Sequence, residues 1–161
     1  MTSRRLVLIR HAEAEDKGGA PDFDRMLTAN GRDHAARLGG ALHRLGIRVE
    51  RMVASPAPRA IETARLCCTG LGIAPSQIRE DRDLYNAMVR KLLPTIARQG
   101  AGLTSLALVG HNIGLTELTA SLAALDPDWS LEKGHAVVLE TSAPWSELDP
   151  GSCRLVHQVQ P

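Results

Sequence analysis

Aromatic residues are scarce in this sequence: two tryptophans, one tyrosine and one phenylalanine make up 2% of its 161 residues. Proteins that bind single-stranded nucleic acid stack the bases on aromatic side chains and follow the phosphates with a basic groove. The 19 basic and 18 acidic residues give a net charge of +1 and are spread along the chain. The composition therefore argues against a nucleic-acid partner.

Cysteines and long apolar runs are also few. Cys67, Cys68 and Cys153 show no C-x-x-C spacing, so we expect buried, reduced thiols and neither a disulfide framework nor a zinc site.

No segment has the length and apolar character of a membrane-spanning helix. The apolar run at 6–9 is too short for a signal peptide, which needs roughly 7 to 15 such residues. We therefore expect a cytoplasmic protein without a membrane partner.

Aliphatic residues are plentiful. Hydrophobic residues make up 43% of the chain and charged residues 23%, the balance of a globular protein. With so few aromatic rings, the core must be built from Leu, Val, Ile and Ala. A chain of this length can bury such a core within one compact unit, so we predict a single domain over residues 1–161.

Strand and helix signals alternate along the chain, which favours an α/β domain with a largely parallel sheet. Short apolar runs predict strands at 5–10, 51–55, 104–110, 135–140 and 153–159, and more weakly at 76–81. Apolar residues spaced three and four apart predict helices within 28–46, 56–72, 86–100 and 114–125. Thr28 is the expected N-cap of the first helix. Met88, Leu92 and Ile96 are expected to form the buried stripe of the third. Polar loops are predicted at 12–27 and 126–134.

Cationic side chains and imidazoles follow three of the predicted strands. Arg10 and His11 end the first, Arg59 follows the second at the start of a helix, and His111 follows the third. In open α/β sheets, ligands bind beyond the carboxyl ends of the strands, where helix N-termini offer N–H donors to anions. These four residues therefore predict an anion site at that edge of the sheet.

The two imidazoles add the option of chemistry to this anion site. Guanidinium groups bind phosphate or carboxylate through a planar fork of donors. A neutral imidazole can attack phosphorus, while a second, protonated imidazole holds an oxygen as charge develops. Phosphoryl transfer needs mainly positioning and charge neutralisation, so this site can act without metal or cofactor. Ser55 lacks the G-x-S-x-G context of a nucleophile and is interpreted as a turn residue.

Four motifs, "RHAEAE", "LTANGRDHA", "VASPAPRAIETARL" and "LVGHNIGLTEL", together resemble those of the histidine phosphatase superfamily. The short chain, "DxDRMLTANGR" and "LYNA" are most similar to its SixA-type phosphohistidine phosphatases. The resemblance runs from residue 5 to about residue 140. It implies a three-layer α/β/α sandwich of the phosphoglycerate mutase-like type, with a mostly parallel mixed sheet in which one strand is antiparallel.

The resemblance also implies roles for particular residues. His11 would be the nucleophile that becomes phosphorylated, and Arg10, Arg59 and His111 would hold the phosphoryl group. Arg25 is expected to reach the site from the loop after the first strand, although Met26 stands where the subfamily has proline.

A general acid is missing from the place where many superfamily members carry a glutamate. Asn86 stands there and is expected to contact the substrate, while Glu80, Asp83 and Asp16 stay open as proton donors. Phosphohistidine protonated on its far nitrogen releases a neutral ring of pKa about 6.5 and needs far less help than an alkoxide. We therefore expect cleavage of P–N bonds.

A chain of 161 residues also leaves little material for a lid over the pocket. An open pocket suits a phosphorylated side chain on another protein.

Other interpretations stay open at this point. The same chemistry could serve a small phosphate ester, or the pocket could belong to a non-catalytic phosphate- or phosphoprotein-binding module, which has no need of His11. A metal held by His11, Glu13 and His111 is a third alternative, but the H-x-E spacing is short for joint ligation and no carboxylate cluster accompanies His111. The favoured hypothesis is a metal-independent phosphatase, with a phosphorylated protein or a small phosphate ester as partner and phosphate ion as product.

Overall fold

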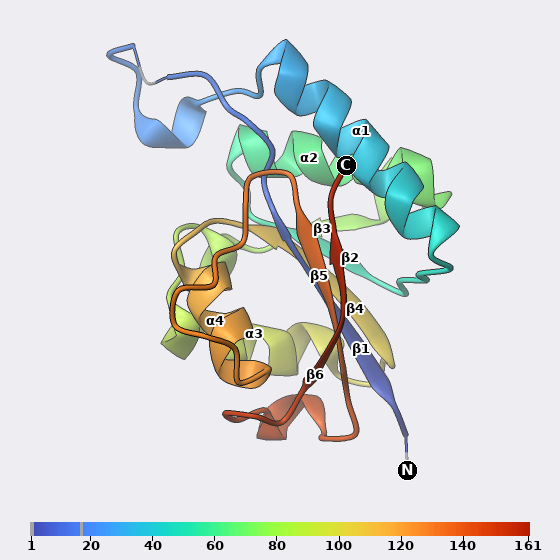
Figure 1. The fold of residues 1–161 in the computed structure, drawn as a ribbon. Coiled ribbons are helices and arrows are strands. Elements are labelled where there is room, and N and C mark those ends of the chain that lie inside the picture. The colour runs from blue at the N-terminus through green and yellow to red at the C-terminus, as the bar shows by residue number, and fades with distance from the viewer. Residues whose placement is uncertain (1, 17) are drawn as a thin grey trace.

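The computed structural model describes residues 2–16 and 18–161. Six strands form one sheet in the order β3-β2-β4-β1-β5-β6 (Figure 1). Each strand begins and ends within one residue of a predicted run or inside it, because short aliphatic runs between polar segments are a strong strand signal. The strands are β1 (Arg4–Arg10), β2 (Met52–Ala54), β3 (Ile78–Glu80), β4 (Ser105–Gly110), β5 (Ala136–Thr141) and β6 (Arg154–Val159).

The direction of the strands makes the sheet mixed but mostly parallel. β1 pairs in parallel with β4, and β2 pairs in parallel with both β3 and β4. β5 is antiparallel to its two neighbours, β1 and β6. β5 is therefore the one strand that runs against the others, and the expected fold class is confirmed.

Helices cover both faces of the sheet (Figure 1). α1 (Ala29–Arg44) and α2 (Pro58–Leu71) pack on one face, and α3 (Val89–Gly100) and α4 (Gly114–Leu122) on the other. Side chains alternate between these layers along β1: Leu6 and Leu8 join the core under α3 and α4, whereas Val7 and Ile9 join the core under α1 and α2. A strand covered on both faces has no solvent side, which explains its uninterrupted aliphatic run.

Local signals set the start of α1 and its distance from α2. The hydroxyl of Thr28 accepts a hydrogen bond from the Gly31 N–H at 2.9 Å, as expected of an N-cap. Gly39 lies where α1 crosses α2, and a Cβ there would collide with the backbone carbonyl of Cys67. Across the contact, a Cβ on Gly70 would lie 2.6 Å from the carbonyl carbon of Gly39. The two helices therefore approach as closely as bare backbone permits.

Two expectations about the helices are wrong. Met88 is not part of a buried stripe: it precedes α3 in an extended conformation and its residue is 47% exposed. Met88 itself has φ −92° and ψ 172°, and Asn86, two positions earlier, has a φ of 47°, in the left-handed region, so the helix that was expected from residue 86 begins only at Val89. α4 ends at Leu122 and does not continue to Leu125.

Two further observations concern composition. Cys67, Cys68 and Cys153 are buried and free, as expected. In the described part of the chain, no helix combines the length and the apolar character that a membrane crossing requires.

Candidate active site

A cavity of about 490 Å³ lies beyond the carboxyl ends of β1, β2 and β4, where His11, His111 and Arg59 in the first turn of α2 meet. All six site residues predicted from the sequence line it, together with four that sequence reasoning missed. The lining consists of Arg10, His11, Asp22, Arg25, Arg59, Tyr85, Asn86, His111, Asn112 and Lys133. The sheet topology explains the convergence, because β1, β2 and β4 are parallel neighbours whose carboxyl ends share one edge.

His11 is held in one tautomer by the backbone that follows it. The residue is 7% exposed, and its Nδ1 lies 2.8 Å from the carbonyl oxygen of Ala12. A carbonyl can only accept, so Nδ1 carries the proton and donates it. Nε2 is therefore the unprotonated nitrogen, and it accepts from the Nε–H of Arg59 at 3.4 Å.

The His11 ring is also kept neutral. Burial lowers its pKa to about 4, and the positive charges of Arg59 and Arg10 act in the same direction, whereas the Ala12 carbonyl opposes them. A histidine with this pKa has its Nε2 lone pair available at neutral pH, which is the state that a nucleophile needs.

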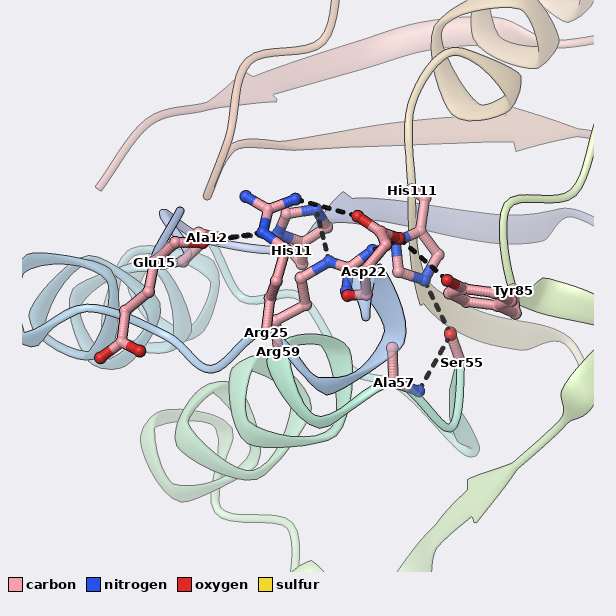
Figure 2. A network of polar contacts seen from close by, with 10 residues as sticks. All are labelled: His11, Ala12, Glu15, Asp22, Arg25, Ser55, Ala57, Arg59, Tyr85 and His111. Carbon is pink, nitrogen blue, oxygen red and sulfur yellow. Dashed lines mark hydrogen bonds and ion pairs between the residues drawn. The ribbon is translucent and has the colours of Figure 1, made fainter. Parts of the chain in front are cut away.

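Arg59 contacts His11, Asp22 and His111 from the centre of the cavity. It is 2% exposed and lies in the first turn of α2. Its Nη1 donates to the backbone oxygen of Asp22 at 2.8 Å and its Nη2 to the Asp22 carboxylate at 3.0 Å, while Nη2 also lies 3.3 Å from Nδ1 of His111 (Figure 2). One guanidinium thus spans the two imidazoles, whose ring centroids are 5.3 Å apart.

His111 is neutral in this arrangement. Because Arg59 can only donate, the Nδ1 of His111 accepts, and its proton sits on Nε2, which donates to the hydroxyl of Ser55 at 2.7 Å. Burial lowers the pKa of His111 to about 3, and the nearby His11 and Arg59 lower it as well. A protonated second imidazole was one option that the sequence left open, but desolvation and surrounding cations disfavour the charged form of His111 here.

Asp22 is the main residue that sequence reasoning missed. Its Oδ2 accepts from Arg59 and, at 2.9 Å, from the hydroxyl of Tyr85, and its Oδ1 accepts from Arg25 Nη1 at 3.2 Å. Burial raises the pKa of Asp22, but hydrogen bonds from Tyr85 and Arg25 and the charge of Arg59 outweigh that effect and hold the pKa far below its ordinary value. The sequence did offer one clue to Asp22: it stands only three positions before Arg25, a predicted site residue, in the loop after β1.

The other lining residues come from the end of β1 and from the connections around the sheet edge. Arg25 reaches the cavity as expected, with its Nε donating to the Glu15 carbonyl at 2.7 Å. Arg10 and Asn112 both donate to the carbonyl of Leu131, at 2.9 and 3.3 Å, which ties the predicted loop 126–134 to the site. Tyr85, Asn112 and Lys133 were missed, although the first two adjoin predicted residues and the third lies in that loop.

No proton-donating acid faces the cavity in the described part of the chain. Asp22 is the one carboxylate in the lining, so Glu80, Asp83 and Asp16 all lie outside it. Asp83 instead pairs with Arg98 at 3.2 Å.

The alternative metal centre is not formed by the described residues. Among them, no three His, Cys, Asp or Glu side chains gather as ligands. Glu13 lies outside the cavity lining, and its carboxylate accepts from the Thr28 hydroxyl at 2.7 Å.

The fold and the site together define an α/β protein with a pocket lined by two imidazoles and a cluster of guanidinium groups. The sequence profile of the histidine phosphatase superfamily (branch 1) matches residues 6–88. The chain belongs to this superfamily.

Known proteins similar to the chain agree with that assignment. An uncharacterized protein of Mycobacterium tuberculosis, MT1313, is 31% identical over 157 residues, which cover 92% of this chain and 96% of that protein. A structure provisionally identified as the phosphohistidine phosphatase SixA from Nakamurella multipartitia is 27% identical, with a TM-score of 0.82 and coverage of 100% of this chain and 98% of that one. The protein histidine phosphatase SixA complexed with tungstate has the same fold, at 21% identity, a TM-score of 0.82 and coverage of 98% and 97%.

Proposed function

We propose that this protein is a metal-independent phosphatase that removes the phosphoryl group from phosphohistidine on another protein. The observation that carries the proposal is the neutral His11 ring, whose proton lies on the nitrogen facing Ala12 and whose unprotonated Nε2 lies beside Arg59. A non-catalytic phosphate-binding module has no need of an imidazole prepared in this way.

Two displacements at phosphorus make up the reaction. In the first, Nε2 of His11 forms a bond to phosphorus while the P–N bond of the substrate breaks, and the electron pair stays on the departing ring. In the second, water attacks phosphorylated His11, releasing phosphate and restoring the imidazole. Arg59 and Arg10 stabilise the oxygens during both steps. The buried Nε of Arg10 has no acceptor among the described residues, and a phosphoryl oxygen would supply one.

The charge of the cavity supports P–N cleavage. Its one carboxylate among the described residues, Asp22, is ionised because of its hydrogen bonds to Tyr85, Arg25 and Arg59. An ionised carboxylate cannot protonate an alkoxide as it leaves. A phosphohistidine protonated on its far nitrogen needs no such donor, because a neutral ring leaves.

The rim of the cavity supports a protein as the carrier of that group. Five large apolar side chains are exposed in the described part of the chain, and four of them stand one or two positions from a cavity-lining residue: Phe23, Met26, Met88 and Ile113. We call these four residues the apolar rim. Exposed large apolar side chains are unusual on a surface without a partner, and their placement next to cavity-lining residues supports a protein interaction there.

A second cavity extends the same surface. It has a volume of about 630 Å³, shares Tyr85 and Asn86 with the first, and is also lined by Met88, Arg90 and Lys91 and by Asp83 in its ion pair with Arg98. Together the two cavities form a wide opening with apolar and cationic side chains. Such an opening suits the protein surface around a phosphorylated side chain better than it suits a small sugar phosphate.

The experiment compares hydrolysis rates on four substrates: a protein phosphorylated on histidine with phosphoramidate, free phosphohistidine, a sugar phosphate and an aryl phosphate. We expect the phosphohistidine protein to be preferred, full activity in excess chelator, and an acid-labile phosphoryl group trapped on the wild-type chain. His11→Asn should abolish turnover and trapping, whereas His43→Asn, on an exposed position of α1, should have no effect. Turnover by His11→Asn, or a clear preference for sugar phosphates, would contradict the proposal.

A further inference from the structure

Asp22 places a negative charge inside a pocket whose other charged residues are cationic. The carboxylate accepts from the same Arg59 Nη2 that lies beside His111, and from Arg25. A phosphoryl group drawn to these guanidinium donors therefore meets a carboxylate that already shares them. The interaction between two such anions is unfavourable and grows as the site loses water.

The contacts of Asp22 keep that charge in place. Its side chain is bound from Arg59, Tyr85 and Arg25, and its backbone oxygen also accepts from Arg59 Nη1 at 2.8 Å. Figure 2 shows the carboxylate between the Arg59 guanidinium and the Tyr85 hydroxyl. To turn away, the carboxylate would have to give up three charged or polar partners at once.

We propose that Asp22 is a specificity-determining residue: its carboxylate repels the phosphoryl group of any substrate, and only a leaving group that is a cationic ring offsets that repulsion by attraction. This inference rests on the proposed function and names the property by which the site selects phosphohistidine. The ring of phosphohistidine, protonated on its far nitrogen, brings a positive charge and an N–H donor. A carboxylate attracts both.

The balance of charge during the reaction follows from this assignment. His11 Nε2 bonds to phosphorus, the P–N bond breaks, and its electron pair neutralises the ring while the proton stays on the far nitrogen. Asp22 takes up no proton. An ester would instead release an alkoxide into a pocket that holds the ionised Asp22, and the developing negative charge would be repelled.

The test is a specificity ratio measured on Asp22→Asn. Its matched control is Asp24→Asn, which removes the same charge from the same short helix at an exposed position outside the cavity lining. For each protein, kcat/KM is measured on free phosphohistidine and on p-nitrophenyl phosphate. We expect Asp22→Asn to lower the ratio of the first to the second by about tenfold or more, the size of one charge interaction at partly buried distance. Competitive inhibition by inorganic phosphate should tighten. The control should leave both quantities unchanged.

A ratio is independent of the fraction of folded enzyme, so partial unfolding of the variant does not affect the outcome. An unchanged ratio in Asp22→Asn, whether both activities fall together or neither changes, overturns the inference and assigns Asp22 a structural role. Failure of the proposed function has a different signature, because it appears in the wild type as a lack of His11-dependent hydrolysis of phosphohistidine.

Discussion

The Nε2 of His111 lies 2.7 Å from the hydroxyl oxygen of Ser55, a fully buried side chain at the end of β2. Ser55 also accepts from the Ala57 N–H at 3.3 Å, which fixes its hydroxyl at the turn into α2 (Figure 2). The serine that the sequence presents as a turn residue therefore also determines which nitrogen of His111 faces Arg59.

Removing that hydroxyl should weaken catalysis more than folding. Ser55→Ala leaves the Nε2–H of His111 without its acceptor, a loss of about 1–2 kcal/mol, and removes the contact that orients the ring toward Arg59. We expect kcat/KM to fall about tenfold. The control is Ser105→Ala, which removes another buried hydroxyl, at the start of β4. Ser105→Ala should change the unfolding midpoint but not kcat/KM, and wild-type kcat/KM in Ser55→Ala would refute the positioning role.

The low pKa of His11 predicts its titration. Burial lowers this pKa to about 4 from an ordinary value of 6.5, so the ring should stay neutral on acidification until the pH approaches 4. ¹⁵N NMR of histidine-labelled protein, assigned with His11→Asn, measures this directly. A midpoint near 6.5 for His11 would show that the ring is solvated and would remove the basis for its nucleophilic role.

The same shift links acid pH to stability. The folded state holds His11 neutral while the unfolded chain protonates it near pH 6.5, so the unfolded state binds more protons between about 6.5 and 4. The contribution of His11 to the free energy of unfolding is therefore fully present above pH 6.5 and falls as the pH drops through that window. Denaturant titrations of wild type and His11→Asn should show a steeper loss in the wild type, and parallel curves would contradict this linkage.

The apolar rim predicts a difference between protein and small substrates. Met88 is 47% exposed beside the cavity, so Met88→Gln should raise KM for a phosphohistidine protein about fivefold, equivalent to about 1 kcal/mol of lost apolar contact. Hydrolysis of p-nitrophenyl phosphate should not change. Leu45→Gln is the matched control, since Leu45 is the fifth exposed large apolar residue, at 44%, and follows α1 away from the site. Equal effects of the two variants on the protein substrate would argue against docking at the rim.

The close crossing of α1 and α2 predicts opposite effects at adjacent glycines. A Cβ on Gly39 would meet the backbone of Cys67, which cannot move aside, whereas a Cβ on Gly40 would meet only the end of the Arg44 side chain at 3.4 Å. Gly39→Ala should lower the free energy of unfolding by about 1–3 kcal/mol. Gly40→Ala should raise it by up to about 1 kcal/mol through helix propensity. Urea denaturation measures both, and equal stability of the two variants would contradict this account of the helix contact.

Much of the architecture was predictable because its signals are local. Aliphatic runs and spacings of three and four encode strands and helices directly, and even the weak run at 76–81 proved to contain β3. Met88 was placed wrongly because apolar spacing continues across it, whereas the backbone is left-handed at Asn86 and extended at Met88, so α3 begins only at Val89. The spacing of apolar residues does not reveal that backbone conformation.

The candidate site was predictable for residues carried by strand ends and helix starts. Arg10, His11, Arg59 and His111 are placed by parallel neighbouring strands, whose carboxyl ends must meet at one edge. Asp22 begins the short 3-10 helix Asp22–Asp24 and Tyr85 follows the short 3-10 helix Arg82–Leu84. Nothing local to either segment specifies that the two side chains meet 2.9 Å apart.

The sequence by itself determined which residues stand at the ends of the strands, and with them the class of chemistry available. The tertiary structure decided the protonation state of those residues. Both imidazoles are neutral because burial and neighbouring guanidinium groups disfavour their charged forms, and Asp22 is ionised because three donors from different segments surround it. Protonation depends on desolvation and on charges brought together across the fold, and neither property is encoded in the order of residues along a single segment.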